Sequence, residues 1–248
     1  IARLREAKVD AIAIAGGDGT IRGVADAMAE AAADGKADAL PLLPLPLGTA
    51  NLLPRSLYGD RGARDLLDQA GEFRRAPLMA GTLNGRIFLV AAAIGFPSTF
   101  ARAREALRDD NRPDRMVSAW TRLATSLRQA FSPRLRYRLD DARHPVRARA
   151  SGIYVPVPRK GGEFEGVLVH WRHPADLLRT PVDLFTGAGN GDDGHDAGGA
   201  TRLAQFRHLS VDSRKPLSAM IDGEPFMLDS PASLTACDTP PEALIPPS

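Results

Sequence analysis

Apolar and polar residues follow two different periodicities in the first 60 positions of the chain. Short apolar runs at residues 9–15 and 40–45 have the length and composition of buried strands. Between them, apolar residues recur at helical spacing along one stripe of residues 21–33, and a shorter helix is expected at 52–57. This order of strand, helix, strand and helix predicts a parallel sheet covered by helices.

The pattern changes after Gly71, where strand-like segments replace the helical periodicity. Residues 73–82 and 86–93 flank an Asn84-Gly85 pair, which indicates a hairpin with a type I′ turn. We expect two helices within an otherwise mostly antiparallel, β-rich region. The helices are expected at 98–108 and 115–131, and the further strands at 134–139, 146–157, 166–171, 205–211, 217–221 and 225–228.

These patterns divide the chain into two domains and a tail. Residues 1–75 form the predicted α/β domain, residues 76–235 the β-rich domain, and residues 236–248 a proline-rich tail that we expect to be extended or loose. The chain opens at Ile1 in a helical pattern and without an initiator Met. We therefore expect a further segment to precede it.

Composition narrows the class of protein. The 248 residues are 44% hydrophobic and 25% charged, which is typical of globular proteins. The longest apolar run, residues 87–96, is about half of the roughly 20 residues that a membrane-spanning helix needs. With one cysteine, Cys237, no internal disulfide can form. We therefore expect a cytoplasmic protein, soluble or peripheral at a membrane.

The charge of the chain argues against one class of partner and favours another. A formal net charge of +2 is too small to indicate nucleic-acid binding, so we expect no nucleic-acid partner. The basic residues are overwhelmingly arginine, whose planar guanidinium group suits carboxylates, phosphates and anionic headgroups.

A Gly-Gly-Asp-Gly-Thr stretch at residues 16–20 joins the first predicted strand to the helix after it. Free N–H groups and the helix dipole make such a junction a natural phosphate site, and glycines let the backbone approach a ligand closely. Asp18 would repel a bare phosphate, so it indicates either a cation between the two groups or a proton-transfer role. The alternative is a tight turn in which Asp18 and Thr20 are local caps.

A second glycine loop, Pro-Leu-Gly-Thr-Ala-Asn at residues 46–51, follows the next predicted strand. Because ligands of parallel sheets bind beyond the carboxyl ends of the strands, we expect the two loops to converge on one crevice.

Two later segments allow more than one interpretation. Residues 115–131 form a predicted amphipathic helix with arginines off its apolar stripe, which could lie on an anionic membrane or wall an acyl pocket, or could simply cover a sheet. Asp222 and Gly223 form either a hairpin turn or part of a catalytic site.

Three stretches of the chain resemble the signature stretches of the diacylglycerol kinase catalytic-domain family, which includes bacterial lipid kinases, sphingosine kinases and ceramide kinases. They are AGGDGTIRGVADAM, PLPLGTANLLPRSLY and IDGEPF, in the family's order. NAD kinases share the Gly-Gly-Asp-Gly-Thr stretch, but their Asn-x-Gly-x-x-Gly-Phe-Leu and Thr-Gly-Ser-Thr-Ala-Tyr stretches do not occur here.

The resemblance implies an α/β nucleotide domain like that of phosphofructokinases, here without its first strand, and a β-rich, sandwich-like antiparallel second domain. It implies ATP and Mg²⁺ as cofactors and a lipid as substrate, bound in a cleft between the domains. The residues implied for the nucleotide site are Gly16, Gly17, Asp18, Gly19, Thr20, Gly48, Thr49 and Asn51.

The resemblance also supplies the acid–base residues for phosphoryl transfer. Asp222 and Asp18 are the candidate bases, between which the sequence does not choose, and Glu224 is a metal or water-mediated ligand. Asp18 and Glu224 are the candidate metal ligands.

The chain departs from the family pattern in three features. The family's first strand, with its Asn-Pro-x-Ser-Gly loop, is absent. Leu52 stands where many members have Asp or Asn, and Glu165-Gly166 replaces the Asp-Gly-x-Leu turn of a structural cation site found in some bacterial members.

The sequence is thus interpreted as an ATP-dependent lipid kinase acting on a diacylglycerol-like or related membrane lipid, with a role in phospholipid biosynthesis. The alternatives are an NAD kinase-like or other small-molecule phosphotransferase, and a degenerate, non-catalytic nucleotide- or lipid-binding domain. The sequence does not decide whether the protein forms a homodimer.

Overall fold

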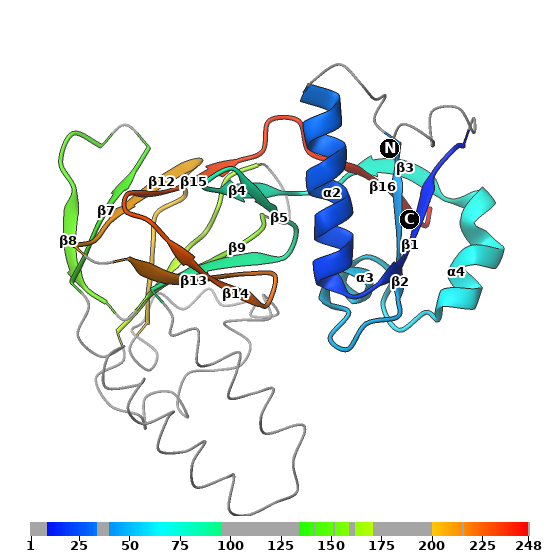
Figure 1. The fold of residues 1–248 in the computed structure, drawn as a ribbon, viewed down its shortest axis with the longest axis horizontal. Helices are drawn as coiled ribbons and strands as arrows, with labels where there is room; N and C mark the ends of the chain where they lie inside the picture. Colours follow the sequence, from blue (N-terminus) through cyan, green and yellow to red (C-terminus); the bar gives the residue numbers. More distant parts are fainter. Residues whose placement is uncertain are drawn as a thin grey trace, which may run out of the picture. The chain divides into compact units, whose positions relative to one another are not determined.

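The computed structural model describes eight stretches of the chain, which form two compact units (Figure 1). The first unit is Ile1–Val90 with Ala236–Ser248, and the second is Ala91–Thr235. The predicted mixed α/β character is confirmed. The described residues are 9–33, 40–95, 134–140, 142–150, 152–158, 162–170, 200–214 and 216–247. The predicted helices at 98–108 and 115–131 lie outside them.

The first unit contains a four-stranded sheet in the order β1-β2-β16-β3. β1 and β2 are parallel, as predicted, and Gly16 at the end of β1 lies opposite Pro46 at the end of β2. Both glycine loops therefore leave the same edge of the sheet. The strands are β1 (Ile12–Gly16), β2 (Leu42–Pro46), β3 (Arg74–Pro77) and β16 (Glu242–Ile245), and the helices are α2 (Asp18–Ala33), α3 (Leu52–Tyr58), α4 (Ala63–Gln69) and the 3₁₀ helix η1 (Ala70–Glu72).

The predicted long hairpin after Gly71 is divided in the structure. Its turn forms as expected, because Asn84 and Gly85 have φ values of 49° and 80° and connect β4 (Gly81–Leu83) to β5 (Arg86–Phe88). Residues 74–77 are instead the separate strand β3, which pairs with β16.

The C-terminal segment is part of the first unit and differs from the loose tail expected from its prolines. β16 pairs in parallel with β2, where Ala243 lies opposite Leu42, and antiparallel with β3. The hydroxyl of Tyr58 donates a 2.7 Å hydrogen bond to the carbonyl of Leu244, and burial raises the pKa of this tyrosine. The prolines stand outside the strand, so they do not interrupt its ladder.

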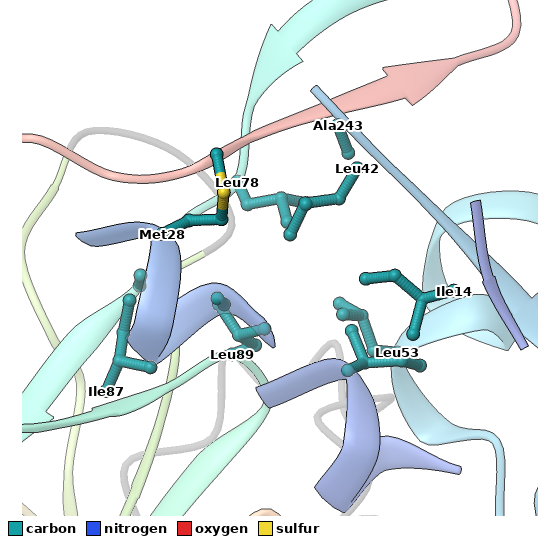
Figure 2. Packing of buried hydrophobic residues seen from close by; sticks show 11 residues of the cluster. Ile14, Met28, Leu42, Leu53, Leu78, Ile87, Leu89 and Ala243 are labelled. Atoms are coloured by element: carbon teal, nitrogen blue, oxygen red, sulfur yellow. The ribbon is translucent and has the colours of Figure 1, made fainter. Parts of the chain in front are cut away.

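Figure 2 shows the core of the first unit, to which the strands and helices contribute side chains from widely separated parts of the chain. The predicted stripe of α2 is confirmed: Ile21, Ala25 and Met28 are buried. They belong to one apolar cluster with Leu42 of β2 and Ala243 of β16. This cluster holds the start of α2 in place behind the first glycine loop.

The second unit is built from antiparallel strands, as predicted. One sheet has the order β11-β10-β9-β6-β13-β14, and a second sheet contains the order β15-β12-β7-β8. The first comprises β6 (Ala91–Ile94), β9 (Gly152–Pro156), β10 (Val167–Val169), β11 (Ala200–Arg202), β13 (Leu217–Ile221) and β14 (Glu224–Leu228). The second includes β7 (Arg134–Leu139), β8 (Val146–Arg149), β12 (His208–Asp212) and β15 (Ala232–Ala236).

Within the described residues, no helix is both long enough and apolar enough to cross a membrane.

Candidate functional site

The Gly-Gly-Asp-Gly-Thr stretch forms the junction between β1 and α2. The carbonyl oxygen of Gly17 accepts hydrogen bonds from the N–H groups of Thr20 and Ile21, at 3.0 and 3.1 Å, so the helix begins at Asp18 rather than at Ile21 as predicted. The N–H groups of Asp18 and Gly19 lie in the first turn of the helix, where no carbonyl group of a preceding turn is available to accept them. This junction has the local geometry of an anion site.

Gly16 is required by packing. A Cβ atom at this position would lie 2.8 Å from the Cβ of Thr20, which cannot move away without shifting the first turn of α2. The first glycine of the stretch therefore lets the strand pass directly beneath the helix that follows it.

The second glycine loop is held together by the side chain of Asn51. Its Oδ1 accepts a 2.7 Å hydrogen bond from the N–H of Gly48, and its Nδ2 donates to the carbonyls of Gly48 at 2.9 Å and Pro46 at 3.2 Å. Asn51 has a φ of 50°, in the left-handed region that asparagine tolerates better than most residues. Its amide is thus engaged with the backbone of its own loop, a role that the sequence interpretation missed.

The two glycine loops meet at Gly17 and Gly48, as expected from the sequence. A Cβ atom on Gly48 would overlap the Cα of Gly17, and a Cβ on Gly17 would lie 3.4 Å from the Cα of Gly48. Only glycine at position 48 permits this approach between the two backbones. Thr49 is exposed beside it.

Asp18 joins the first loop to α3. Its Oδ2 accepts the N–H of Leu52 and its Oδ1 accepts the N–H of Leu53, both at 2.9 Å. Asn51, at the N-cap position of α3, makes no side-chain capping hydrogen bond, so the carboxylate of Asp18 caps this helix from another element. A negative charge here is also favoured by the helix dipole.

This contact is an unexpected version of the capping alternative. In that alternative Asp18 capped its own turn, whereas in the structure it caps a helix more than 30 positions away. The signal that could have found it is the pairing of an aspartate in one loop with an uncapped helix start after the other.

In the second unit, Asp222 and Gly223 form the two-residue turn between β13 and β14, with φ values of 48° and 90°. The hairpin interpretation is therefore confirmed. Asp222 is nevertheless buried, with 7% of its surface exposed. Its N–H donates to the carbonyl of Ala91 at 2.9 Å, and its Oδ1 accepts the N–H of Ala91 at 3.0 Å. This reciprocal pair fastens the turn to β6.

Two further groups stand near this turn. Tyr154 of β9 is buried, and burial, followed by the charge of Asp222, raises its pKa to about 12. Glu224, the first residue of β14, is exposed. Asp222 and Glu224 thus differ in exposure although one residue separates them.

The candidate metal ligands Asp18 and Glu224 have different surroundings. Among the residues that the structure describes, no three His, Cys, Asp or Glu side chains gather closely enough to hold a metal ion. Mg²⁺ at phosphoryl-transfer sites is commonly held by one or two carboxylates together with substrate phosphates, so a site with few carboxylates fits its chemistry. Asp18 already accepts one N–H on each oxygen, whereas Glu224 is exposed.

Comparison with known proteins finds a family match in the first third of the chain. Residues 1–81 match the sequence family described as the diacylglycerol kinase catalytic domain. The resemblance to this family is confirmed over these residues. The diacylglycerol kinase match contains both glycine loops and the helices that begin in them, and it ends at the first residue of β4. No curated protein matches the chain in sequence.

Solved structures extend the likeness to the fold of nearly the whole chain. One from Bacillus anthracis str. Sterne, of a diacylglycerol kinase, is 14% identical, with a TM-score of 0.60 and coverage of 97% of this chain and 78% of that one. Another, of a candidate diacylglycerol kinase from the same organism, is 17% identical, with a TM-score of 0.64 and coverage of 96% and 79%. At these identities the structures establish the fold.

Proposed function

We propose that this protein is an ATP-dependent lipid kinase that transfers the γ-phosphate of Mg-ATP to a hydroxyl group of a diacylglycerol-like membrane lipid. The observation that carries the proposal is the contact between Gly17 and Gly48 inside the segment that matches the diacylglycerol kinase catalytic domain. Two backbones this close, one at a helix start, form a surface of amide groups suited to phosphates.

In the proposed mechanism the first unit holds the nucleotide. The N–H groups of Asp18 and Gly19 in the first turn of α2 bind phosphate oxygens, while Gly48 and Thr49 line the neighbouring loop. When bound, Mg²⁺ neutralises charge on the phosphates as it spreads in the transition state. Asn51 keeps the second loop in the shape that permits this approach.

Proton transfer requires a carboxylate that can reach the acceptor hydroxyl. Asp18 and Asp222, the two predicted bases, each accept backbone N–H groups, and Asp222 is buried. We therefore propose that these two aspartates position the loops and that the exposed Glu224 is the general base that accepts the hydroxyl proton.

One observation favours a second candidate, a non-catalytic nucleotide- or lipid-binding domain. Leu52, at the start of α3, leaves 40% of its surface exposed beside the second glycine loop. Its N–H is used by Asp18, and its side chain brings no polar group to this position.

The test is transfer of labelled phosphate from Mg-ATP to detergent-dispersed diacylglycerol, monoacylglycerol, sphingosine, ceramide and phosphatidylglycerol, with NAD alongside. We expect a labelled lipid, and a loss of about a hundredfold or more for Glu224→Gln, since a general base contributes at least that much. Glu163→Gln, which alters another exposed glutamate of the second unit, is the matched control.

Each other outcome selects a different function. Label on NAD would replace the lipid kinase with a small-molecule phosphotransferase. Binding of an ATP analogue without label on any acceptor would favour the non-catalytic domain.

A further inference from the structure

One face of the β7–β8 hairpin carries arginine at every described outward position. In β7, arginines alternate with Leu135, Tyr137 and Leu139. Leu135 is fully buried, whereas Arg136 and Arg138 are exposed. Because successive strand residues point to opposite faces, these two arginines share the face turned away from the core.

The neighbouring strand repeats this arrangement. Arg136 lies opposite Arg147 of β8, which is also exposed, and the next facing positions are held by Arg134 and Arg149. Like charges placed directly opposite each other destabilise a pair of strands. β8 is an edge strand, because it is the last strand in the order of its sheet. Figure 1 shows the β7–β8 hairpin at the edge of the second unit. The fold thus concentrates positive charge on an accessible strand pair, although repulsion between the facing arginines destabilises that pair.

Within the described part of the chain, no acidic side chain forms an ion pair with Arg136, Arg138 or Arg147. Asp212 of β12 is opposite Arg136 in register without pairing to it. Asp140, in the turn after β7, directs its Oδ1 to the N–H groups of Arg207 and His208, at 2.9 and 2.8 Å.

We propose that this arginine face, defined as Arg136, Arg138 and Arg147, binds the headgroups of anionic phospholipids at a bilayer surface. Guanidinium groups donate paired hydrogen bonds to phosphate oxygens, and an anionic surface relieves the repulsion between facing arginines. The choice of a membrane as partner rests on the proposed lipid-kinase function, because such a kinase meets its substrate in a bilayer.

A simpler reason for charge on an edge strand is protection against pairing with other chains. That explanation and the membrane explanation predict different behaviour when the charge is removed. If the arginines protect the edge, their removal causes self-association of the protein without any lipid. If they bind headgroups, their removal weakens attachment of the protein to vesicles.

The experiment measures sedimentation of the full-length protein with phosphatidylcholine vesicles, with and without phosphatidylglycerol, in the absence of ATP. Each arginine near an anionic surface strengthens binding by roughly fivefold. The triple variant Arg136→Gln, Arg138→Gln, Arg147→Gln should therefore bind phosphatidylglycerol vesicles ~100-fold more weakly. The control removes the same charge from exposed arginines of the first unit, with Arg61→Gln, Arg64→Gln and Arg74→Gln, and should bind nearly as the parent does.

The outcomes separate the explanations. Equal weakening of both triple variants would mean that net charge alone attracts the vesicles, and an unchanged β7–β8 variant that self-associates would mean edge protection. Preferential loss of binding to a labelled single-stranded oligonucleotide would identify a nucleic-acid surface. Each of these overturns the proposal.

The test also stands apart from the kinase proposal. Vesicle binding is measured without turnover, and the β7–β8 variant should phosphorylate detergent-dispersed lipid as the parent protein does. Vesicle binding without kinase activity would support the proposal for the arginine face and contradict the proposed lipid-kinase function.

Discussion

Two aspartates of signature stretches, one in each unit, perform a similar structural task in different surroundings. Asp18 of the first unit is half-buried and accepts the N–H groups of two consecutive residues at the start of α3. Asp222 of the second unit is buried and exchanges hydrogen bonds with one residue of β6. Both carboxylates connect segments that are distant in sequence, so an aspartate of a signature stretch can have a positioning role.

The difference between them lies in what each carboxylate controls. Asp18 attaches one glycine loop to the helix after the other, so its loss should disturb the proposed nucleotide site. Asp222 holds a turn, and its charge acts on the buried hydroxyl of Tyr154. Substitutions can therefore test the two roles by different measurements.

The largest effect is expected for Gly48→Ala, which attacks the contact on which the first role depends. The added Cβ would overlap the Cα of Gly17, and two backbones must separate to admit it. We expect a loss of ~3 kcal/mol in the free energy of unfolding, measured with urea, together with loss of ATP-analogue binding. Gly23→Ala is the control, because a Cβ there meets nothing within 4 Å. Retained ATP-analogue binding in Gly48→Ala would separate the loop contact from the nucleotide site.

A smaller effect is expected for Asp18. Asp18→Ala removes both acceptors from the start of α3 and should destabilise the protein by about 2 kcal/mol. Asp18→Asn keeps one carbonyl acceptor but turns an N–H donor toward the helix, so its loss should be intermediate. Because this role is positional, both variants should weaken ATP-analogue binding as well as kcat. Asp10→Asn, at an exposed aspartate of the same unit, is the control. Full stability and nucleotide affinity with loss of kcat alone would return Asp18 to the role of base.

The smallest effect on stability is expected for Asp222→Asn. Asparagine tolerates the left-handed backbone and keeps an oxygen for the N–H of Ala91, so unfolding should change by less than about 1 kcal/mol. Removal of the charge should lower the pKa of Tyr154 from about 12, while burial keeps it above 10.0. Absorbance titration of tyrosinate, with Tyr154→Phe to assign the signal, measures this shift. An unchanged pKa would show that the carboxylate does not act on the ring.

The same tyrosine makes stability depend on pH in a defined direction. Its pKa is raised in the folded state, so the neutral hydroxyl favours folding below pH 10 and this contribution is lost as the pH rises from 10.0 to about 12. Tyr154→Phe should remove up to one of the protons released on unfolding in that range.

Much of the first unit could be predicted because its signals are local. The strand predicted at residues 9–15 and observed at 12–16, the stripe of Ile21, Ala25 and Met28, and the convergence of the two glycine loops follow from short-range patterning and the edge rule for parallel strands. The Asn84-Gly85 turn formed because its residues favour the required dihedral angles.

The roles of individual side chains were less accessible. The resemblance implied Asn51 only as a lining residue of the nucleotide site, and the structure adds that its amide holds the loop backbone. Its three hydrogen bonds depend on how the chain returns on itself within the loop, which residue type alone does not specify.

By itself, the sequence determined the strand, helix, strand and helix order of its first 60 residues, the two glycine loops, and the likeness of the segment that contains them to the diacylglycerol kinase catalytic domain. Each of these depends on neighbours a few residues apart. The tertiary structure decided where the C-terminal strand pairs, which carboxylates become buried, and that Asp18 caps α3. These depend on contacts between residues from 34 positions apart, for Asp18 and Leu52, to 201 positions apart, for Leu42 and Ala243, whose free energies are gained only when distant segments are brought together.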